Sequence, residues 1–307
     1  GVSRLFLTPS GVAIPGESSY VVKKAKTGTG LELTIDSSLQ YITEQDLAQE
    51  INATKAVSGV AVVMDVKTGR VLALASYPTY DPNIWEKGLT IAQAKAMYSE
   101  STYVPALSRP LQGLFAPAST FKAFSIFAAV KAGYSLDASY DCPGKYKVGN
   151  RDFTNYESKE LGRMNLKTGI AVSCDTLWYK IAYSEWLKDG GLSPKNPNNF
   201  FFNAAHQFQL DKKTGIDLPG EAFGRIPDRE WKVNYWKQNK DFYCNYQSRA
   251  AKKDLTPFLI QLAKENCIDG GVLRAGDAVN FSIGQGDTVI TPLKQAQVYS
   301  AIANGGT

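Results

Sequence analysis

The sequence predicts an α/β fold of the α+β kind, an antiparallel sheet flanked by helices with an all-helical part beside it. The clearest signal lies at 59–77, where the β-rich runs VAVVMDV and RVLALAS are separated by a short Lys-Thr-Gly turn. Both runs are nearly continuously apolar, which predicts that helices cover the hairpin on both faces. The chain of 307 residues with 44% hydrophobic content is long enough to bury a substantial core.

Elements in the first half follow from turn and capping signals. Residues 1–30 are rich in Gly, Ser, Pro and Lys without sustained periodicity, and are predicted to be a connector from a preceding domain. A strand is expected at 31–36, then an amphipathic helix over 37–53 capped by Asp36 or Ser37. The proline-punctuated stretch 76–88 is predicted to be a surface loop.

In the second half, helical patterns alternate with loops. A helix is expected to begin near residue 119, a loop over 140–162, and one helix over 164–191 that ends at paired glycines. A short helix is expected around His206, and the polar stretch 229–278 is predicted to be an insertion. A last helix should begin at Thr291-Pro292, since Thr caps helices and Pro fits their first turn.

Charge and composition exclude some classes of function. The net charge is +5, but the basic residues are scattered rather than clustered with aromatics, so nucleic-acid binding is not expected. The positive surplus would suit an anionic surface such as a membrane face or an acidic polymer. No apolar run approaches the roughly 20 residues that cross a bilayer. Both ends look cut, which predicts a fragment of a longer protein.

The four cysteines do not have the CxxC spacing of zinc sites, so no structural metal is expected. Cys244 and Cys267 flank one polar segment, and they would be able to pair in an oxidising compartment. Buried free thiols are the alternative.

Ser119 is the candidate nucleophile, in the stretch LFAPASTFKAFSIFAAVKAG. A reactive serine needs a base, and the chain has a single histidine. Lys122 follows one helical turn later on the same face, and burial near Phe115, Phe121 and Phe124 would lower its pKa. The helix N-terminus would add N–H groups for an oxyanion. The alternative is a capping serine beside a surface lysine.

A second candidate group lies in VSCDTLWYKIAY, where Ser173 and Asp175 are expected on another helix. Ser173 would relay protons between Lys122 and a leaving amine, and Asp175 would bridge Lys122 to the substrate. An ordinary polar helix face is the alternative. His206 is interpreted as a helix-face residue near the surface rather than as a catalytic base.

Taken together, PASTFK, SCD, KKTGIDLPGE and NFSIGQGDTVITPLKQAQVYSAIANGG resemble class B penicillin-binding proteins, the cell-wall transpeptidases of bacteria. The likeness runs from about residue 30 to the end, with the blocks in family order. The TGIDLPGE and SIGQGDTVITPL blocks point to the elongation type, similar to penicillin-binding protein 2. The insertion at 244–267 resembles actinobacterial members. The resemblance implies a serine transpeptidase or β-lactamase-like fold.

The resemblance also implies roles. Ser119 would be the nucleophile, Lys122 its base and Ser173 the proton shuttle. Asp175 stands where many relatives have Asn, although elongation-type members often carry this S-x-D form. An ionised Asp175 would stabilise Lys122 as an ammonium and so oppose its action as a base.

The family's third motif, K-T-G, lies on a strand downstream of the GQG block. Four copies occur here, at 26–28, 67–69, 167–169 and 213–215, and all four lie upstream of that block. All are therefore interpreted as structural. We expect a transpeptidase domain over 31–307 that is truncated before the catalytic K-T-G strand, preceded by the connector from a missing pedestal domain. The fragment itself is expected to be inactive if it lacks that motif.

The function implied is a peptidoglycan D,D-transpeptidase that cross-links stem peptides through a Ser119 acyl-enzyme and is acylated by β-lactams, with no cofactor. Expected partners are a membrane glycan polymerase and elongation-complex proteins. The full protein would have one N-terminal anchor in the cytoplasmic membrane and work outside it. Two alternatives stay open: a class D-like β-lactam hydrolase or sensor, whose second motif usually ends in an apolar residue unlike Asp175, and a non-catalytic scaffold.

Overall fold

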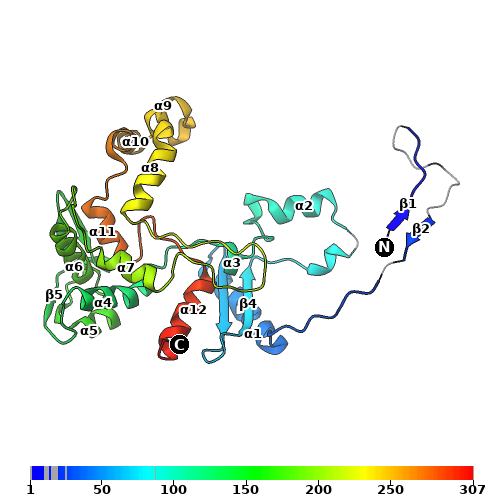
Figure 1. Ribbon diagram of the computed structural model, residues 1–307, viewed down its shortest axis with the longest axis horizontal. Helices are drawn as coiled ribbons and strands as arrows, with labels where there is room; N and C mark the ends of the chain where they lie inside the picture. Colours follow the sequence, from blue (N-terminus) through cyan, green and yellow to red (C-terminus); the bar gives the residue numbers. More distant parts are fainter. Residues whose placement is uncertain (1, 10–13, 15–19, 25, 87, 307) are drawn as a thin grey trace. The chain divides into compact units, whose positions relative to one another are not determined.

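The computed structural model describes residues 2–9, 14, 20–24, 26–86 and 88–306 (Figure 1). The chain divides into two units, Gly1–Thr34 and Ile35–Thr307. In the first unit, strand β1 (Val2–Arg4) pairs antiparallel with β2 (Tyr20–Lys23). Most of 10–19 in the predicted connector lies outside the described residues.

Short strands and many helices make up the second unit. The strands are β3 (Gly59–Met64), β4 (Val71–Tyr77), β5 (Tyr140–Cys142), β6 (Lys145–Val148), β7 (Arg151–Thr154) and β8 (Gly162–Met164). The α-helices are α1 (Ser37–Thr54), α2 (Ile91–Tyr98), α3 (Arg109–Gln112), α4 (Lys122–Lys131), α5 (Leu166–Ala171), α6 (Asp175–Lys188), α7 (Phe200–Gln207), α8 (Arg229–Cys244), α9 (Tyr246–Arg249), α10 (Pro257–Asp269), α11 (Ala275–Phe281) and α12 (Pro292–Ala303). The 3₁₀ turns are η1 (Pro82–Trp85), η2 (Glu100–Thr102), η3 (Ala118–Phe121), η4 (Tyr156–Ser158) and η5 (Lys252–Asp254).

The predicted hairpin is confirmed as β3 and β4, which pair antiparallel. Helix α1 packs against both strands, and α12 and α3 contact β3. In α1, the Asp36 side chain accepts a hydrogen bond from the Leu39 N–H at 2.9 Å, so Asp36 is the cap. Thr291 caps α12 in the same way and Pro292 begins it, as predicted. The expected alternation of a hairpin with flanking helices is therefore present (Figure 1).

An aromatic core is buried among helices α4, α6, α7 and α11. Helix α4 packs against α7, and α6 packs against α11. Phe121 is 1% exposed and its ring meets those of Phe124 and Phe281 at centroid distances of 5.4 and 4.9 Å. Trp178 of α6 is fully buried in the same cluster. Dense packing of large rings holds α4 and α6 in one relation to each other, and the candidate site residues lie at the start of these two helices or in the turns directly before them.

Three predicted elements were wrong. Residues 31–36 form no strand, although the Asp36 N–H still reaches the Leu72 carbonyl at 3.0 Å. The predicted loop 140–162 instead contains short antiparallel pairs, β5 with β8 and β6 with β7. The single helix over 164–191 is two helices, because Ser173 adopts a left-handed backbone with φ of 56° that ends α5 and precedes α6.

The polar stretch at 229–278 is largely helical. Its helices α8 and α10 pack against each other, and the Cys244–Cys267 disulfide, with Cα atoms 4.7 Å apart, joins them. The pairing left open by the sequence is thus formed. A second disulfide, Cys142–Cys174, was not predicted.

Candidate active site

Ser119 lies in η3, the 3₁₀ turn directly before α4, as expected for a residue at the start of that helix. Its side chain is exposed. The preceding Ala118 is in the left-handed region with φ of 49°, and its N–H donates to the Gly284 carbonyl at 3.0 Å. A strained residue next to a candidate nucleophile is typical of functional sites, where surrounding contacts hold the strain.

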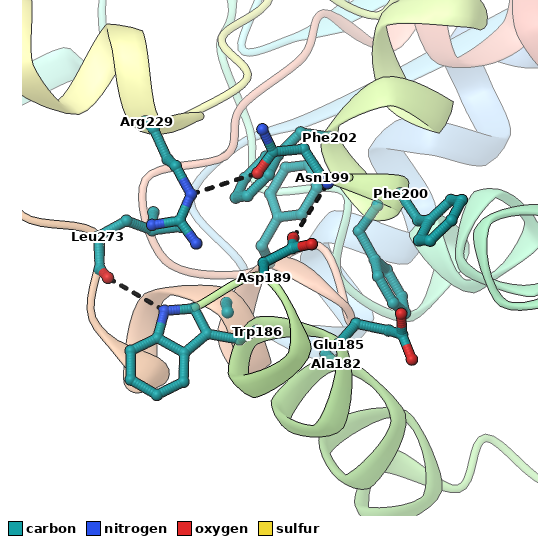
Figure 2. Close-up of a pocket in the computed structure, with 12 residues that line it drawn as sticks. Ala182, Glu185, Trp186, Asp189, Asn199, Phe200, Phe202, Arg229 and Leu273 are labelled. Carbon is teal, nitrogen blue, oxygen red and sulfur yellow. Dashed lines mark hydrogen bonds between the residues drawn. The ribbon is translucent and has the colours of Figure 1, made fainter. Parts of the chain in front are cut away.

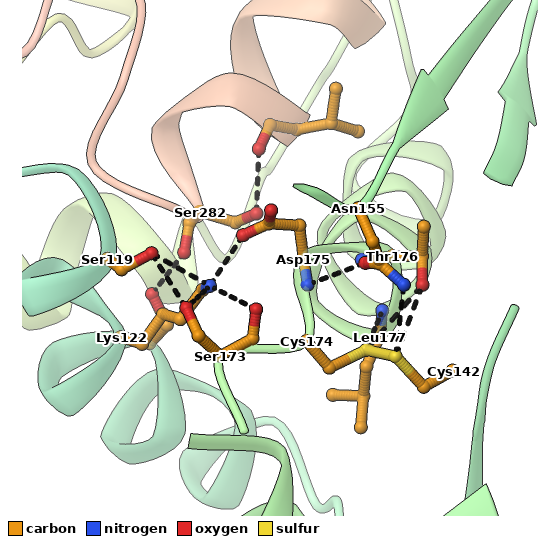
Figure 3. Close-up of polar contacts among 12 residues, drawn as sticks. Ser119, Lys122, Cys142, Asn155, Ser173, Cys174, Asp175, Thr176, Leu177 and Ser282 are labelled. Atoms are coloured by element: carbon orange, nitrogen blue, oxygen red, sulfur yellow. Dashed lines mark hydrogen bonds and ion pairs between the residues drawn. A yellow bond between two sulfur atoms is a disulfide. The ribbon is translucent and has the colours of Figure 1, made fainter. Parts of the chain in front are cut away.

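Lys122 is buried beneath the two serines, with a relative exposure of 1%. Its Nζ lies 3.1 Å from Ser119 Oγ, 2.9 Å from Ser173 Oγ and 3.0 Å from the Ser173 carbonyl oxygen (Figure 3). The Asp175 carboxylate pairs with the same nitrogen at 2.5 Å. The structure therefore brings together all four residues singled out in the sequence.

Burial lowers the pKa of the Lys122 amine, and its hydrogen bond and charge interaction with Asp175 oppose that shift without cancelling it. The predicted direction is confirmed. Phe121 and Phe124, both 1% exposed, belong to the buried surroundings, whereas Phe115 is 44% exposed and is not part of that core. The expectation about Phe115 was wrong: its backbone pairs with Ile290, and its side chain stays exposed.

The contacts around Lys122 allow its amine and the two serine hydroxyls to exchange protons. An ammonium has three N–H donors, but four acceptor atoms lie within reach of Nζ. A neutral amine donates two hydrogen bonds and keeps one lone pair for a hydroxyl proton. Ser173 Oγ also donates to Ser119 Oγ at 2.9 Å, so the amine and both hydroxyls form a closed triangle.

Ser173 occupies the position just after α5 where glycine is common. Its own N–H bonds to the Ile170 carbonyl at 3.0 Å, and the Cys174 N–H bonds to the Gly169 carbonyl at 2.9 Å. A left-handed conformation costs a serine about 1 kcal/mol or more relative to glycine. In this backbone conformation the Ser173 hydroxyl lies against Lys122 and Ser119. A glycine would fit the conformation more easily but would supply no hydroxyl.

Asp175 is the first residue of α6, and Tyr179 lies one turn later. Burial foremost, and then the charge of Asp175, raises the pKa of the Tyr179 phenol. Tyr179 is therefore a neutral phenol at physiological pH. Among the described residues, the ion pair of Lys122 is with Asp175.

Two supporting features were missed in the sequence. The Cys142–Cys174 disulfide attaches the residue between Ser173 and Asp175 to strand β5, and the Asn155 side chain bonds to the first turn of α6 (Figure 3). A cysteine inside the SCD motif, with its partner 32 residues earlier, was the available signal for the disulfide. Asn155 sits among other polar residues and carries no local signal.

Gly284 supports the nucleophile turn by having no side chain. A Cβ there would lie 2.4 Å from the Phe121 Cβ and 2.7 Å from the Ala118 oxygen, and φ is +67°. We expect Gly284→Ala to lower the free energy of unfolding by about 2–4 kcal/mol, measured by denaturant titration. Gly286→Ala is the matched control, because φ is +74° but the nearest atom would be 3.4 Å away. Equal losses in both variants would contradict the contact.

The K-T-G copies at 67–69 and 167–169 lie where predicted, in the β3–β4 turn and in α5. In the first, the Thr68 hydroxyl donates to Asp65 at 2.6 Å, a turn contact. In the copy at 213–215, the Thr214 N–H donates to the Glu221 side chain at 2.8 Å. Lys26 belongs to the first unit and is exposed. None of these contacts involves Ser119.

His206 lies on α7 with its side chain 38% exposed, as expected for a helix-face residue near the surface. Its Nε2 lies 3.0 Å from Asp228 and its Nδ1 3.3 Å from Asp211. Both ring nitrogens thus lie beside carboxylates rather than beside Ser119.

A small cavity lies between α6, α7 and α11, lined in part by Trp186, Asp189 and Arg229 (Figure 2). Its volume of about 20 Å³ has room for about one water molecule. It is therefore too small for a peptide. Within the described residues, no cluster of His, Cys, Asp and Glu suits a metal ion, and no helix is long and apolar enough to span a membrane.

An exposed serine over a buried lysine, completed by a second serine from the turn between α5 and α6, is the arrangement of a serine acyl-transfer site. The family model of the penicillin-binding protein transpeptidase domain matches residues 59–307. The chain belongs to this family.

Relatives and solved structures agree with this assignment. Peptidoglycan D,D-transpeptidase MrdA of Escherichia coli K12 is 28% identical over 291 residues, 92% of this chain and 37% of the relative. Penicillin-binding protein PbpB of Mycobacterium tuberculosis is 31% identical over 71% of this chain and 29% of its own. Pseudomonas aeruginosa PBP2, solved in complex with WCK 5153, is 27% identical with a TM-score of 0.65, covering 90% of this chain and 51% of that one. The chain thus spans about a third of the length of the curated relatives it matches.

Proposed function

We propose that the protein carrying this chain is a peptidoglycan D,D-transpeptidase of the elongation type, with Ser119 as its nucleophile. One observation carries the proposal: the buried Lys122 Nζ lies within hydrogen-bond distance of both Ser119 Oγ and Ser173 Oγ. The similarity to MrdA proteins, which are named as peptidoglycan D,D-transpeptidases, supports the substrate class.

The chemistry follows from that triangle of groups. Ser119 Oγ attacks the carbonyl carbon between the two terminal D-alanines while its proton passes to the neutral amine of Lys122. The C–N bond then breaks, and the leaving D-alanine amine receives the proton through Ser173. An ester to Ser119 results. The amine of a second stem peptide attacks this ester, its proton returns through the same groups to Ser119 Oγ, and the cross-link forms.

Backbone N–H groups at the start of α4 are the candidates to stabilise the oxyanion, which stays a prediction. β-Lactams present a reactive amide to the same serine, so we propose that they acylate Ser119 and that the resulting ester is hydrolysed slowly. This proposal needs no metal or cofactor for any of its steps.

We further propose that the third motif comes from a strand following the GQG block. The described part of β3 pairs with β4 alone. A cavity of about 380 Å³ lies between Gly59, Thr120 and Ile290, next to the nucleophile turn. The side-chain amide of Gln295 on its wall is buried without a hydrogen-bond partner among the described residues. A strand bearing K-T-G would fill this cavity and pair with β3, and coverage of 37% of MrdA leaves length for it.

We propose an extracytoplasmic location with a single N-terminal membrane anchor, reached through the connector at 1–30, and a glycan polymerase and elongation-complex proteins as partners. A PBP2 from Helicobacter pylori has been solved in complex with MreC, with a TM-score of 0.68 to this chain. Another neighbour comes from a structure entitled a peptidoglycan synthase complex that coordinates polymerisation and crosslinking. Co-purification of the full-length protein with such partners from membranes is the corresponding test.

The test of the catalytic proposal is penicillin labelling of the full-length protein. We expect a fluorescent penicillin to form a stable adduct, located by peptide mass spectrometry on the peptide that contains Ser119, and Ser119→Ala to abolish it. Ser248→Ala, which changes an exposed serine on α9, is the control and should label normally. An adduct on a different peptide would overturn the site. Rapid turnover of penicillin would favour a hydrolase, and absence of labelling a scaffold.

A further inference from the structure

The start of α6, where Asp175 lies, is held from outside the helix. The first N–H groups of a helix have no partner within it. Here the Asn155 Oδ1 atom accepts hydrogen bonds from the N–H groups of Asp175 and Thr176, each at 2.9 Å (Figure 3). Asn155 comes from the end of β7, 20 residues before Asp175, and its side chain is 4% exposed.

The amide nitrogen of Asn155 is engaged as fully as its oxygen. Nδ2 donates to the Pro143 carbonyl at 3.0 Å and to the Lys159 carbonyl at 2.8 Å. With two donors and two accepted hydrogen bonds, the buried amide uses all of its capacity. Aspartate, serine and alanine lack one or both halves of this pattern, so the position is specific for an amide of this length.

A covalent bond holds the same turn to the same support. The Cys142–Cys174 disulfide joins the residue before Asp175 to the end of β5, with Cα atoms 6.2 Å apart. The Thr176 hydroxyl donates to the Pro143 carbonyl at 2.7 Å. Residues 142–144 and Asn155 therefore form one support for the turn, and the Asn155 N–H itself bonds to the Gly144 carbonyl at 3.1 Å.

We propose that Asn155 is a positioning residue for the transpeptidase reaction: by capping α6 from outside, it sets the Asp175 carboxylate and the Ser173 hydroxyl against Lys122. It does not touch Lys122, Ser119 or the reacting atoms, and it acts through the turn at 173–176. The disulfide fixes the same turn at its other end. This inference rests on the proposed function, because its readout is acylation of Ser119.

The test compares the rate of penicillin acylation of the full-length protein and of Asn155→Ala across pH. A displacement of the Asp175 carboxylate of about 1 Å is expected to lower the acylation rate constant about 10- to 100-fold. Because Asp175 raises the pKa of Lys122, its displacement also moves the rising limb of the pH profile to lower pH. A merely structural role would lower thermal stability and leave that limb in place, which would overturn the proposal.

A double-mutant cycle with Asp175→Asn gives the second criterion. If Asn155 acts through Asp175, adding Asn155→Ala to Asp175→Asn moves the rising limb of the acylation pH profile little further. Shifts of the two variants that simply add in the double mutant contradict the proposal. Should Asn155→Ala fail to fold, Asn155→Ser is used instead, since its hydroxyl keeps a polar group at this buried position but lacks the amide's pairing with both N–H groups. Its rising limb must likewise move to lower pH, and a limb at the wild-type position contradicts the proposal. If the wild-type protein is acylated at Ser119 but the two shifts are additive, this inference alone is disproved. If the wild-type protein is not acylated, the proposed function is disproved, and this inference with it.

Discussion

Replacing Lys122 by methionine is expected to reduce penicillin acylation of the full-length protein by about 10²–10⁴-fold, the usual contribution of a general base. Methionine fills the buried volume left by the lysine stem, but it has no lone pair to accept the Ser119 proton. Ser173 alone would not replace it, because a hydroxyl is a poor proton acceptor at neutral pH. The measurement is the rate of covalent labelling under single-turnover conditions.

Two further variants test whether the loss of acylation comes from the missing base, and not from a missing positive charge or from a change in α4. Lys122→Arg keeps a cation beside Asp175, but a guanidinium is not deprotonated in proteins, so we expect the same loss of acylation. Lys131→Met changes an exposed lysine at the other end of α4 and should label as the wild type does. Substantial acylation by a folded Lys122→Met protein would show that another group accepts the proton.

The second large effect concerns Asp175. Its hydrogen bond and charge both raise the pKa of Lys122, against the larger lowering by burial. In Asp175→Asn the charge interaction disappears and the hydrogen bond is made to a neutral amide oxygen, so the pKa of Lys122 falls further. The neutral amine is the active form and accumulates above its pKa. The acylation rate therefore rises with pH through this pKa, and in Asp175→Asn the rise occurs at lower pH. Stopped-flow acylation over the pH range measures it.

Tyr179 provides the control for that shift. It lies on α6 close to Asp175, is 5% exposed, and its phenol is neutral at these pH values. Tyr179→Phe removes a hydroxyl without changing the charge near Lys122, and its pH profile should match that of the wild type. A pH profile unchanged in Asp175→Asn, or moved to higher pH, would mean that Asp175 does not set the protonation of Lys122.

Local spacing was sufficient to predict part of the site. Ser119 and Lys122 are one helical turn apart, so their proximity depends only on the start of α4 being helical. The pairing with Ser173 and Asp175 spans more than 50 residues of sequence. No local sequence pattern predicts a contact over that separation, and the prediction of it came from the family resemblance. Helix caps at Asp36 and Thr291 were likewise predictable, because capping is a local interaction.

The elements that sequence reasoning missed depend on tertiary contacts. A left-handed serine at 173 runs against intrinsic preference and exists because α5, α6 and the disulfide hold it. Strands β5 to β8 have three or four residues each and lie among turn-forming residues, so their pairing outweighs weak propensity. The role of Asn155 depends on where α6 begins in space, which its neighbours in sequence do not indicate.

The central claim is that the buried amine of Lys122 accepts the proton of Ser119, and its protonation state can be followed directly. NMR titration of the full-length protein labelled with ¹³C at lysine Cε, with Lys122→Arg to assign the signal, would measure its pKa. We predict a Lys122 pKa below the ordinary 10.5, coinciding with the midpoint of the acylation pH profile. A Lys122 that stays protonated across the whole range in which acylation accelerates would contradict the claim.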